Sequence, residues 1–148
     1  MKTYKEIIDK FERASEYHTF IQSFGHGSLD KLNDSINQAY PLLWVRPMAS
    51  IGIQPYGSRT LTFEVYLLDV PKLDRTTDIQ TMSDAERALY DVYAYFRDGA
   101  EQQDYGVNMT TLTPVMEAFQ DRMFGWVGTI DVDTSTSGIT LCNIPTEI

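Results

Sequence analysis

Apolar residues recur at three- and four-residue spacing along the first part of the chain, which is typical of a helix that covers one side of a core. The series consists of Tyr4, Ile7, Ile8, Phe11, Ala14, His18 and Ile21. It predicts a helix from about Thr3 to Ser23. We expect this helix to stop at FGHGSLD and a mobile loop to follow, because Gly25 and Gly27 permit backbone angles that other residues avoid.

Two stretches in the middle of the chain have the patterns of strands. YPLLWVRPMASIGI is apolar and rich in β-formers, which predicts strands over Leu42–Arg46 and Met48–Ile53 with a bend at Pro47. A turn is expected at Gln54–Ser58. Beyond it, Leu61, Phe63, Val65 and Leu67 alternate with Thr60, Thr62, Glu64 and Tyr66. A period of two is typical of a half-buried strand, and this is the clearest strand in the sequence.

The polar segment Val70–Met82 is long for a connection within a compact domain, and we expect it to project from the fold. Ser83 is predicted to cap a second helix, with Glu86 completing a capping box and the helix ending near Gly99. Its apolar stripe consists of Met82, Ala85, Leu89, Val92, Tyr93 and Phe96. Packing against the sheet is the interpretation that we favour over a ligand pocket.

The last third of the chain is predicted to close the sheet. Ala100–Asn108 is expected to be a loop or a frayed helix end. Leu112–Phe119 and Trp126–Val132 are predicted strands joined by Gln120–Gly125. Together the elements predict a single α+β domain over residues 1–148, with an antiparallel or mixed sheet of about four to five strands packed against two main helices.

Composition agrees with an ordinary globular domain. Of 148 residues, 43% are hydrophobic, which is enough to form a core without metals or disulfides. The one cysteine, Cys142, cannot form an intrachain disulfide, and charges spread through the first residues argue against a secretory signal, so a cytoplasmic setting is expected. The net charge of −9 repels phosphate backbones and anionic membranes, which argues against sequence-specific DNA binding and against membrane association.

The stretch GTIDVDTSTSG places Asp131 and Asp133 two residues apart. Alternation along a strand puts both on one side, opposite Ile130 and Val132, as a solvent-facing acidic row. An EF-hand loop counted from Asp131 would need glycine and glutamate at its sixth and twelfth positions, which hold threonine and cysteine. A catalytic carboxylate pair stays open as an alternative, although no partner is near in sequence.

The remaining candidates for chemistry are two histidines and the cysteine. His18 lies on the apolar stripe of the first predicted helix, which favours a partly buried, hydrogen-bonded structural histidine over a ligand. His26 stands between two glycines and is expected to be exposed. A zinc site or Cys-His dyad that includes Cys142 has no supporting short spacing. We therefore expect no catalytic residue, metal site or cofactor.

Several segments resemble, in order, those of a family of tailed-phage neck and tail-completion proteins. HTFIQSFGHGSLDKLNDSINQAYPLLWVRP, from His18 to Pro47, is similar to its N-terminal part, in which a helix and a glycine loop lead into a YPL strand. LTFEVYLLDVPKLD, Leu61–Asp74, is similar to its strand ending in an acidic loop. The helix SDAERALYDVYAYF, the strand pair at Pro114–Phe119 and Gly125–Trp126, and the closing CNIP at Cys142–Pro145 follow. The chain most resembles the neck ring proteins of crAss-like phages.

The resemblance implies a tail terminator-like fold and a structural protein of the virion, made in the host cytoplasm, with no catalytic residues. Such a protein forms a ring in the neck, the head-to-tail connector, between portal and tail. The implied partners are further copies of the chain in a six- or twelvefold ring, and other neck, portal or tail proteins. DNA would pass through the lumen, and twelve copies at −9 each would surround it with a formal charge of −108.

In a ring, every subunit uses one patch to meet a different patch on its neighbour. The projecting segment Val70–Met82 is expected to supply one of these patches, to the adjacent subunit or to the next ring of the neck. A solvated loop with no partner is the alternative for this segment. Its expected contact residues are Lys72, Leu73, Asp74, Arg75 and Asp78. The alternative is a small cytoplasmic ligand-binding module or enzyme with its site in a cleft between sheet and helices. A cavity with converging polar groups would favour this alternative, and ring-shaped particles would exclude it.

Overall fold

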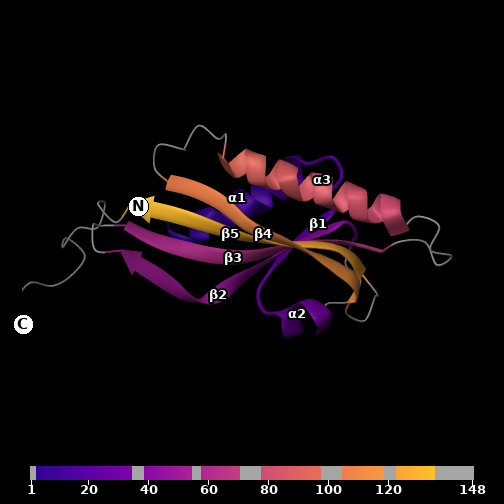
Figure 1. Cartoon of the computed structure of the whole chain (residues 1–148), viewed down its shortest axis with the longest axis horizontal. Helices are drawn as coiled ribbons and strands as arrows, with labels where there is room; N and C mark the ends of the chain where they lie inside the picture. The colour runs from indigo at the N-terminus through magenta and orange to yellow at the C-terminus, as the bar shows by residue number, and fades with distance from the viewer. Residues whose placement is uncertain are drawn as a thin grey trace, which may run out of the picture.

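The computed structural model describes residues 3–34, 39–54, 58–70, 78–97, 105–118 and 123–135 (Figure 1). In chain order the elements of this part are α1 (Tyr4–Tyr17), β1 (Ser23–His26), α2 (Leu29–Asp34), β2 (Leu42–Gln54), β3 (Ser58–Asp69), α3 (Asp78–Arg97), β4 (Tyr105–Ala118) and β5 (Met123–Ser135). The strands form one sheet in the order β1-β2-β3-β5-β4. The predicted α+β class, with a mixed sheet and two main helices, is confirmed.

The sheet is built from two antiparallel hairpins joined along their inner strands. β2 pairs with β3 and β4 pairs with β5, while β3 and β5 pair with each other from Ser58↔Ser135 to Asp69↔Phe124. The short β1 is the parallel member and pairs only with the beginning of β2, from Ser23↔Leu42 to His26↔Val45. In Figure 1, α1 and α3 lie along one face of the sheet, and α2 lies against one end of the other.

The main core fills the space between the sheet and the two long helices. The predicted apolar positions of β3 face it: Leu61, Phe63, Val65 and Leu67 are at most 2% exposed. Phe63 packs edge-on against Phe11 of α1, with ring centroids 5.6 Å apart, and Phe11 contacts Phe96 of α3 at 4.2 Å. The core thus ties both helices to the central strand, and the predicted burial of the α3 stripe is confirmed at Ala85, Leu89, Val92 and Phe96.

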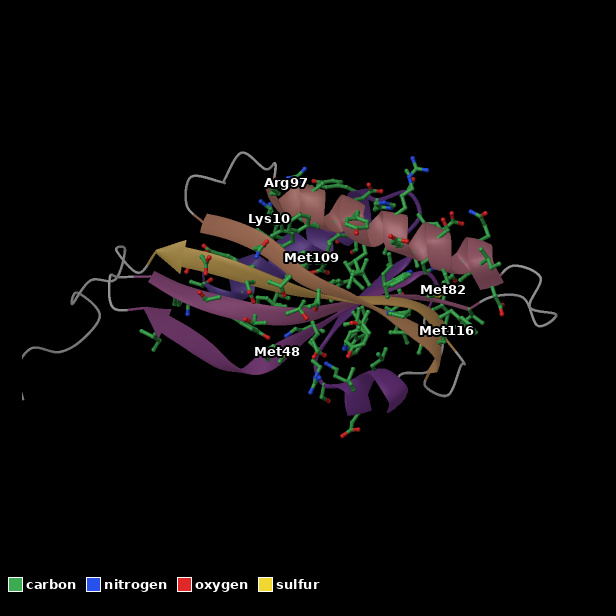
Figure 2. All side chains as sticks on the ribbon, in the orientation of Figure 1. Lys10, Met48, Met82, Arg97, Met109 and Met116 are labelled. Carbon is green, nitrogen blue, oxygen red and sulfur yellow. The ribbon has the colours of Figure 1, made fainter. Side chains whose placement is uncertain are left out.

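Between the two helices, a buried lysine takes part in the packing. Lys10 is 7% exposed, and its ammonium lies 5.5 Å from the ring centroids of both Tyr95 and Phe96 (Figure 2). Aromatic faces attract a cation, and the aliphatic stem of lysine packs as an apolar group. This position on α1 therefore contributes to the contact with α3 although its residue type is polar.

A second, smaller cluster lies on the opposite face beneath α2. It consists of Leu32, Leu42, Trp44, Tyr66, Leu68 and Met123, with Leu29, Tyr40, Val115 and Val127 packed against it. The indole Nε1 of Trp44 donates to the carbonyl oxygen of Gly27 at 3.0 Å, which anchors the segment before α2. β3 is thus buried on both faces near its end, and alternation alone did not predict this second core.

The first helix is shorter than predicted. A capping box is present, in which the Glu6 amide donates to Thr3 Oγ1 and the Thr3 amide donates to the Glu6 carboxylate. The helix ends at Tyr17, since His18 adopts extended angles, φ −82° and ψ 124°. Ile21 keeps the apolar spacing because it still packs into the main core, but it lies beyond the end of the helix.

The predicted mobile loop at FGHG is wrong, because Ser23–His26 forms β1. Gly25 is needed for packing there: a Cβ at this position would lie 2.2 Å from a ring carbon of Trp44. Gly27 has φ +136°, a region that side chains disfavour, and ends the strand before α2. Gly25 therefore permits close contact with the Trp44 ring, and Gly27 permits the turn before α2. The helix α2 was not predicted from the sequence.

The second long helix begins at Asp78, five residues before the predicted cap. Ser83 lies within the helix, so the predicted capping box at Ser83 and Glu86 is wrong. Thr81 is buried, and the Met82 carbonyl accepts a hydrogen bond from Trp126 Nε1 at 2.9 Å, which holds the polar first turn against β5. These tertiary contacts therefore stabilise a first helical turn whose sequence has no apolar periodicity. Of the predicted loop, residues 71–77 lie outside the described part.

The second hairpin also begins earlier than predicted. β4 starts at Tyr105, within the expected loop Ala100–Asn108, and β5 starts at Met123, within the expected connection Gln120–Gly125. β4 is an edge strand whose residues Asn108 and Thr111 are exposed, so its first half has no apolar run. In the first hairpin, the predicted bend is confirmed as an irregularity in register between Pro47 and Ile51.

We expect Phe63→Ala to lower the free energy of unfolding by about 3–5 kcal/mol, because it removes the ring that joins α1 to the sheet. Phe63→Leu, which keeps most of the volume, should cost less. Trp126 packs against the main core but is only partly buried, and Trp126→Phe should cost about 1 kcal/mol through loss of the bond to Met82. Urea denaturation measures these differences, and a loss below about 1 kcal/mol for Phe63→Ala would contradict the assignment of faces.

Candidate functional site

The predicted acidic row lies on the sheet face opposite α1 and α3. Ile130 and Val132 point into the main core and are fully buried, so Asp131 and Asp133 point to the other side. Each carboxylate is held by a threonine of β3. Thr62 Oγ1 donates to Asp131 Oδ1 at 2.7 Å, and the Thr60 hydroxyl donates to Asp133. The two aspartates thus lie on one side of the sheet, with Asp133 exposed and Asp131 partly buried.

Further polar residues continue this row toward α2. Arg46 Nη1 and the Tyr66 hydroxyl both lie 2.9 Å from Glu64 Oε2. Burial, and then the bond to Glu64, raise the pKa of Tyr66 to about 12, so the tyrosine remains a donor. On the neighbouring strands, the hydroxyls of Thr111 and Thr129 are 3.0 Å apart. We call the polar surface of Arg46, Thr60, Thr62, Glu64, Thr111, Thr129, Asp131 and Asp133 the open face, since no described helix covers it.

The open face presents carboxylates that already accept hydrogen bonds from the sheet. Its one cation, Arg46, lies against Glu64. Within the described ranges, no three His, Cys, Asp or Glu side chains lie close enough to hold a metal ion. The surface can therefore offer hydroxyls and negative charge to a neighbouring molecule, and it lacks the converging oxygen set that a divalent cation needs.

His18 is a hydrogen-bonded structural histidine, as predicted. Its Nε2 lies 2.9 Å from Asp91 Oδ2 on α3, and its Nδ1 accepts from the Phe20 amide at 3.1 Å. Because Nδ1 is the acceptor, Nε2 carries the proton and donates to Asp91. The residue therefore ties the end of α1 to the middle of α3.

His26 is not exposed as predicted, since its ring is half-buried against α1. Its Nε2 lies 2.5 Å from the Tyr4 hydroxyl. Burial, followed by the charge of Lys31 on α2, lowers the pKa of His26, and burial raises that of Tyr4. The two histidines bind different partners, and Cys142 lies outside the described part, so the zinc and Cys-His hypotheses gain no support from the described geometry.

A surface groove of about 520 Å³ lies beside the His18–Asp91 contact. Tyr17–Phe20 forms one wall, and Asp84, Arg87, Ala88 and Asp91 of α3 form the other. Ala88 is 2% exposed and forms part of an apolar floor, whereas Tyr17 is 72% exposed. Polar, charged and aromatic groups thus converge at the outer surface of the helix layer.

The cleft that the enzyme alternative would need, between sheet and helices, is filled by side chains. Phe11, Phe63 and Phe96 occupy this space and are at most 1% exposed. The groove beside His18 is lined instead by α3, by the end of α1 and by the segment that follows it, with no residue of a strand. It is built from two segments about 65 residues apart in sequence, and sequence reasoning missed it. The available signal was the charge pattern of Asp84, Arg87 and Asp91, which share one helical side at spacings of three and four.

The predicted inter-subunit contact residues are only partly described. Asp78 is the first residue of α3, where a carboxylate interacts favourably with the positive end of the helix dipole. One of its carboxyl oxygens is buried and has no hydrogen-bond partner among the described residues. Lys72, Leu73, Asp74 and Arg75 lie outside the described part. Their contact with a neighbour therefore stays a prediction.

Comparison of the sequence with models of protein families finds no match, and a search of curated proteins finds no significant relative. Among helices in the described ranges, none has both the length and the apolar composition needed to cross a bilayer.

We expect calcium and magnesium titrations, followed by calorimetry, to detect no site tighter than about 10 μM, because Asp131 and Asp133 lack further oxygen ligands. The matched variant Asp131→Ala should give the same titration as the parent chain. A tighter site that is lost in Asp131→Ala would contradict the interpretation of the row as a surface feature.

Stability should fall on acidification through the ordinary histidine pKa of 6.5, because unfolded His26 binds a proton there and folded His26, with its lowered pKa, does not. The loss should level off once the pH is below the folded pKa. His26→Asn should flatten this part of the profile of unfolding free energy against pH, measured by urea denaturation. His18→Asn is the control and should keep the dependence that His26 contributes. An unchanged profile in His26→Asn would exclude this assignment.

Proposed function

We propose that this chain is a ring-forming structural protein of a tailed-phage neck, located between portal and tail and surrounding the path of the DNA. The observation that carries the proposal is the ordered likeness of five segments to neck and tail-completion proteins. Three of these segments correspond to regular elements: YPL leads into β2, LTFEVYLLD lies in β3, and SDAERALYDVYAYF lies in α3. The likeness therefore follows the order of the fold and is not confined to one loop.

The outer edge of β4 is poorly suited to strand pairing between copies, which favours association of the copies through side-chain surfaces. The Tyr93 hydroxyl lies 3.5 Å from the carbonyl oxygen of Val107, so α3 occupies part of the edge. Pro114 has no amide hydrogen, and the register shifts twice along the strand, after Met109 and after Val115. Such features discourage open-ended strand pairing between copies. Closed assembly through two different side-chain patches is compatible with a protected edge.

The charge of the chain also supports the proposal. A net charge of −9 per copy gives the formal −108 expected for twelve copies. The open face adds hydroxyls and the carboxylates of Asp131 and Asp133, and its arginine is bound to its third carboxylate, Glu64. A conduit wall of this kind repels the phosphate backbone at the short distances over which salt does not screen the charges. DNA can then pass without adhering.

The proposed partners are further copies of the chain in a six- or twelvefold ring, together with neighbouring portal, neck or tail proteins. The proposed location is the virion, after synthesis in the host cytoplasm. The alternative, a ligand-binding module or enzyme with its site between sheet and helices, is not favoured by the described core, because Phe11, Phe63 and Phe96 fill that space.

Mass photometry of the purified chain should detect a discrete assembly in addition to any monomer, with negative-stain images showing rings. Six copies of the 16.9 kDa chain would weigh about 101 kDa and twelve about 203 kDa. The measurement should span about 0.1 to 50 μM subunit, because association depends on protomer concentration. Monomers across this whole range would contradict a self-assembling ring subunit.

A further inference from the structure

The groove between Tyr17–Phe20 and α3 has a charge pattern that specifies a particular kind of occupant. Asp84, Arg87 and Asp91 follow one another along α3 as acid, base and acid. Asp84 and Asp91 are seven residues apart, or about 10.5 Å along a helix. Arg87 and the side chain of Asp91 are exposed. An extended peptide that lies along this wall would be complementary if it carried base, acid and base over the same length.

The chain itself contains such a segment. Lys72, Asp74 and Arg75 follow one another as base, acid and base, with Leu73 between the first two. Three residues of extended chain span about 10 Å, which matches the separation of the two aspartates on α3. The leucine matches the apolar floor at Ala88 and Phe20. Charge order, end-to-end length and apolar character therefore agree between groove and segment.

We propose that the groove beside His18 is the docking site for residues 72–75 of a second copy of this chain. Lys72 pairs with Asp84, Asp74 with Arg87, and Arg75 with Asp91. This inference rests on the proposed ring function and deepens it by naming both halves of the contact. One subunit supplies the groove and the next supplies the segment, which is a heterologous interface of the kind that closes a ring.

The connection to α3 prevents this particular pairing within one chain, whereas the reverse order, with Arg75 beside Asp84, is within reach of the same chain and is separated by the mixing experiment below. In the pairing above, Arg75 lies beside Asp91, which is thirteen residues, or about 20 Å, along α3 from Asp78. The three residues from Arg75 to Asp78 of the same chain reach only about 10 Å. A segment therefore cannot adopt this pairing with its own helix, whereas the segment of a neighbouring subunit has no such limit.

The groove also has the composition of an interface that binds tightly. Tyrosine and arginine are enriched among the residues that dominate binding energy, and Tyr17 and Arg87 are both exposed here. The wall is prearranged, because His18 donates to Asp91 and Gln80 Nε2 donates to Asp84 at 2.7 Å. A carboxylate accepts several hydrogen bonds, so these contacts orient the aspartates and leave capacity for an incoming cation.

The test uses charge reversal of the groove and of the segment in the full chain. The groove variant Asp84→Lys/Asp91→Lys and the segment variant Lys72→Glu/Arg75→Glu should each lose the assembly detected by mass photometry. Circular dichroism establishes that each variant is folded. Glu12→Lys/Glu16→Lys is the control, since it makes the same charge change at exposed positions of α1 outside this groove and should assemble normally.

Mixing the two variants separates contact between copies from contact within one chain. In a ring where the two variants alternate, every junction joins either two native halves or two reversed halves, so assemblies should return to at least half of the parent level. The chain that carries all four substitutions should also assemble. Rescue in the fourfold variant without rescue in the mixture would overturn docking between copies, and normal assembly of both separate variants would overturn the groove as the contact.

A second measurement keeps the inference testable if the parent chain stays monomeric, an outcome that contradicts the ring proposal by itself. A synthetic peptide of residues 70–77 should shift the NMR signals of His18 and Asp91 in the full chain, and the groove variant should abolish the shift of the His18 signal. The same peptide with glutamate at positions 72 and 75 is the control. No shift with the native peptide at about 1 mM would overturn the docking site.

Discussion

The structure depends on β3 being paired along both edges and buried on both faces at its far end. It pairs with β2 on one side and with β5 on the other, and its partners on β5 extend over its whole length. Toward the helices it presents a continuous apolar row, and toward α2 it presents Tyr66 and Leu68. Between Glu64 and Tyr66 this second face changes from polar to apolar. The position of this change determines where α2 covers the sheet and where the open face begins.

The elements predicted well are those whose packing partner is the main core alone. The alternation of β3 and the apolar stripe of α3 each face this core, so local periodicity is sufficient to identify them. The predicted ends of the elements were wrong where contact with a residue distant in sequence determines the backbone conformation. Trp126 holds the Met82 carbonyl and thereby the first turn of α3, and Trp44 requires the small Gly25 and so places β1 beside β2. Neither contact leaves a signal in the neighbouring sequence.

The open face and the groove beside His18 also differed in how well they could be predicted from the sequence. Asp131 and Asp133 could be assigned to one face from alternation within a single strand, although their threonine partners depend on the register between β3 and β5. The groove could not be predicted, because one of its walls was assigned to the interior of the first helix. His18 was correctly expected to be hydrogen-bonded and partly buried, but its partner Asp91 lies 73 residues away. Sequence patterns identify which side a residue faces, and tertiary structure determines what it meets.

The two surfaces hold their carboxylates differently, and in the proposed ring this difference would let one subunit bind a neighbour through the groove and repel DNA with the open face. On the open face, Asp131 and Asp133 are held by hydroxyls of the same sheet, and the one arginine lies against Glu64. In the groove, Arg87 is exposed between two aspartates, so charges of both signs face outward. Mixed charge favours specific pairing with a complementary segment, while carboxylates among hydroxyls favour a surface that DNA does not contact. Because helices separate the groove from the sheet, neighbour contacts in the groove would leave the open face uncovered.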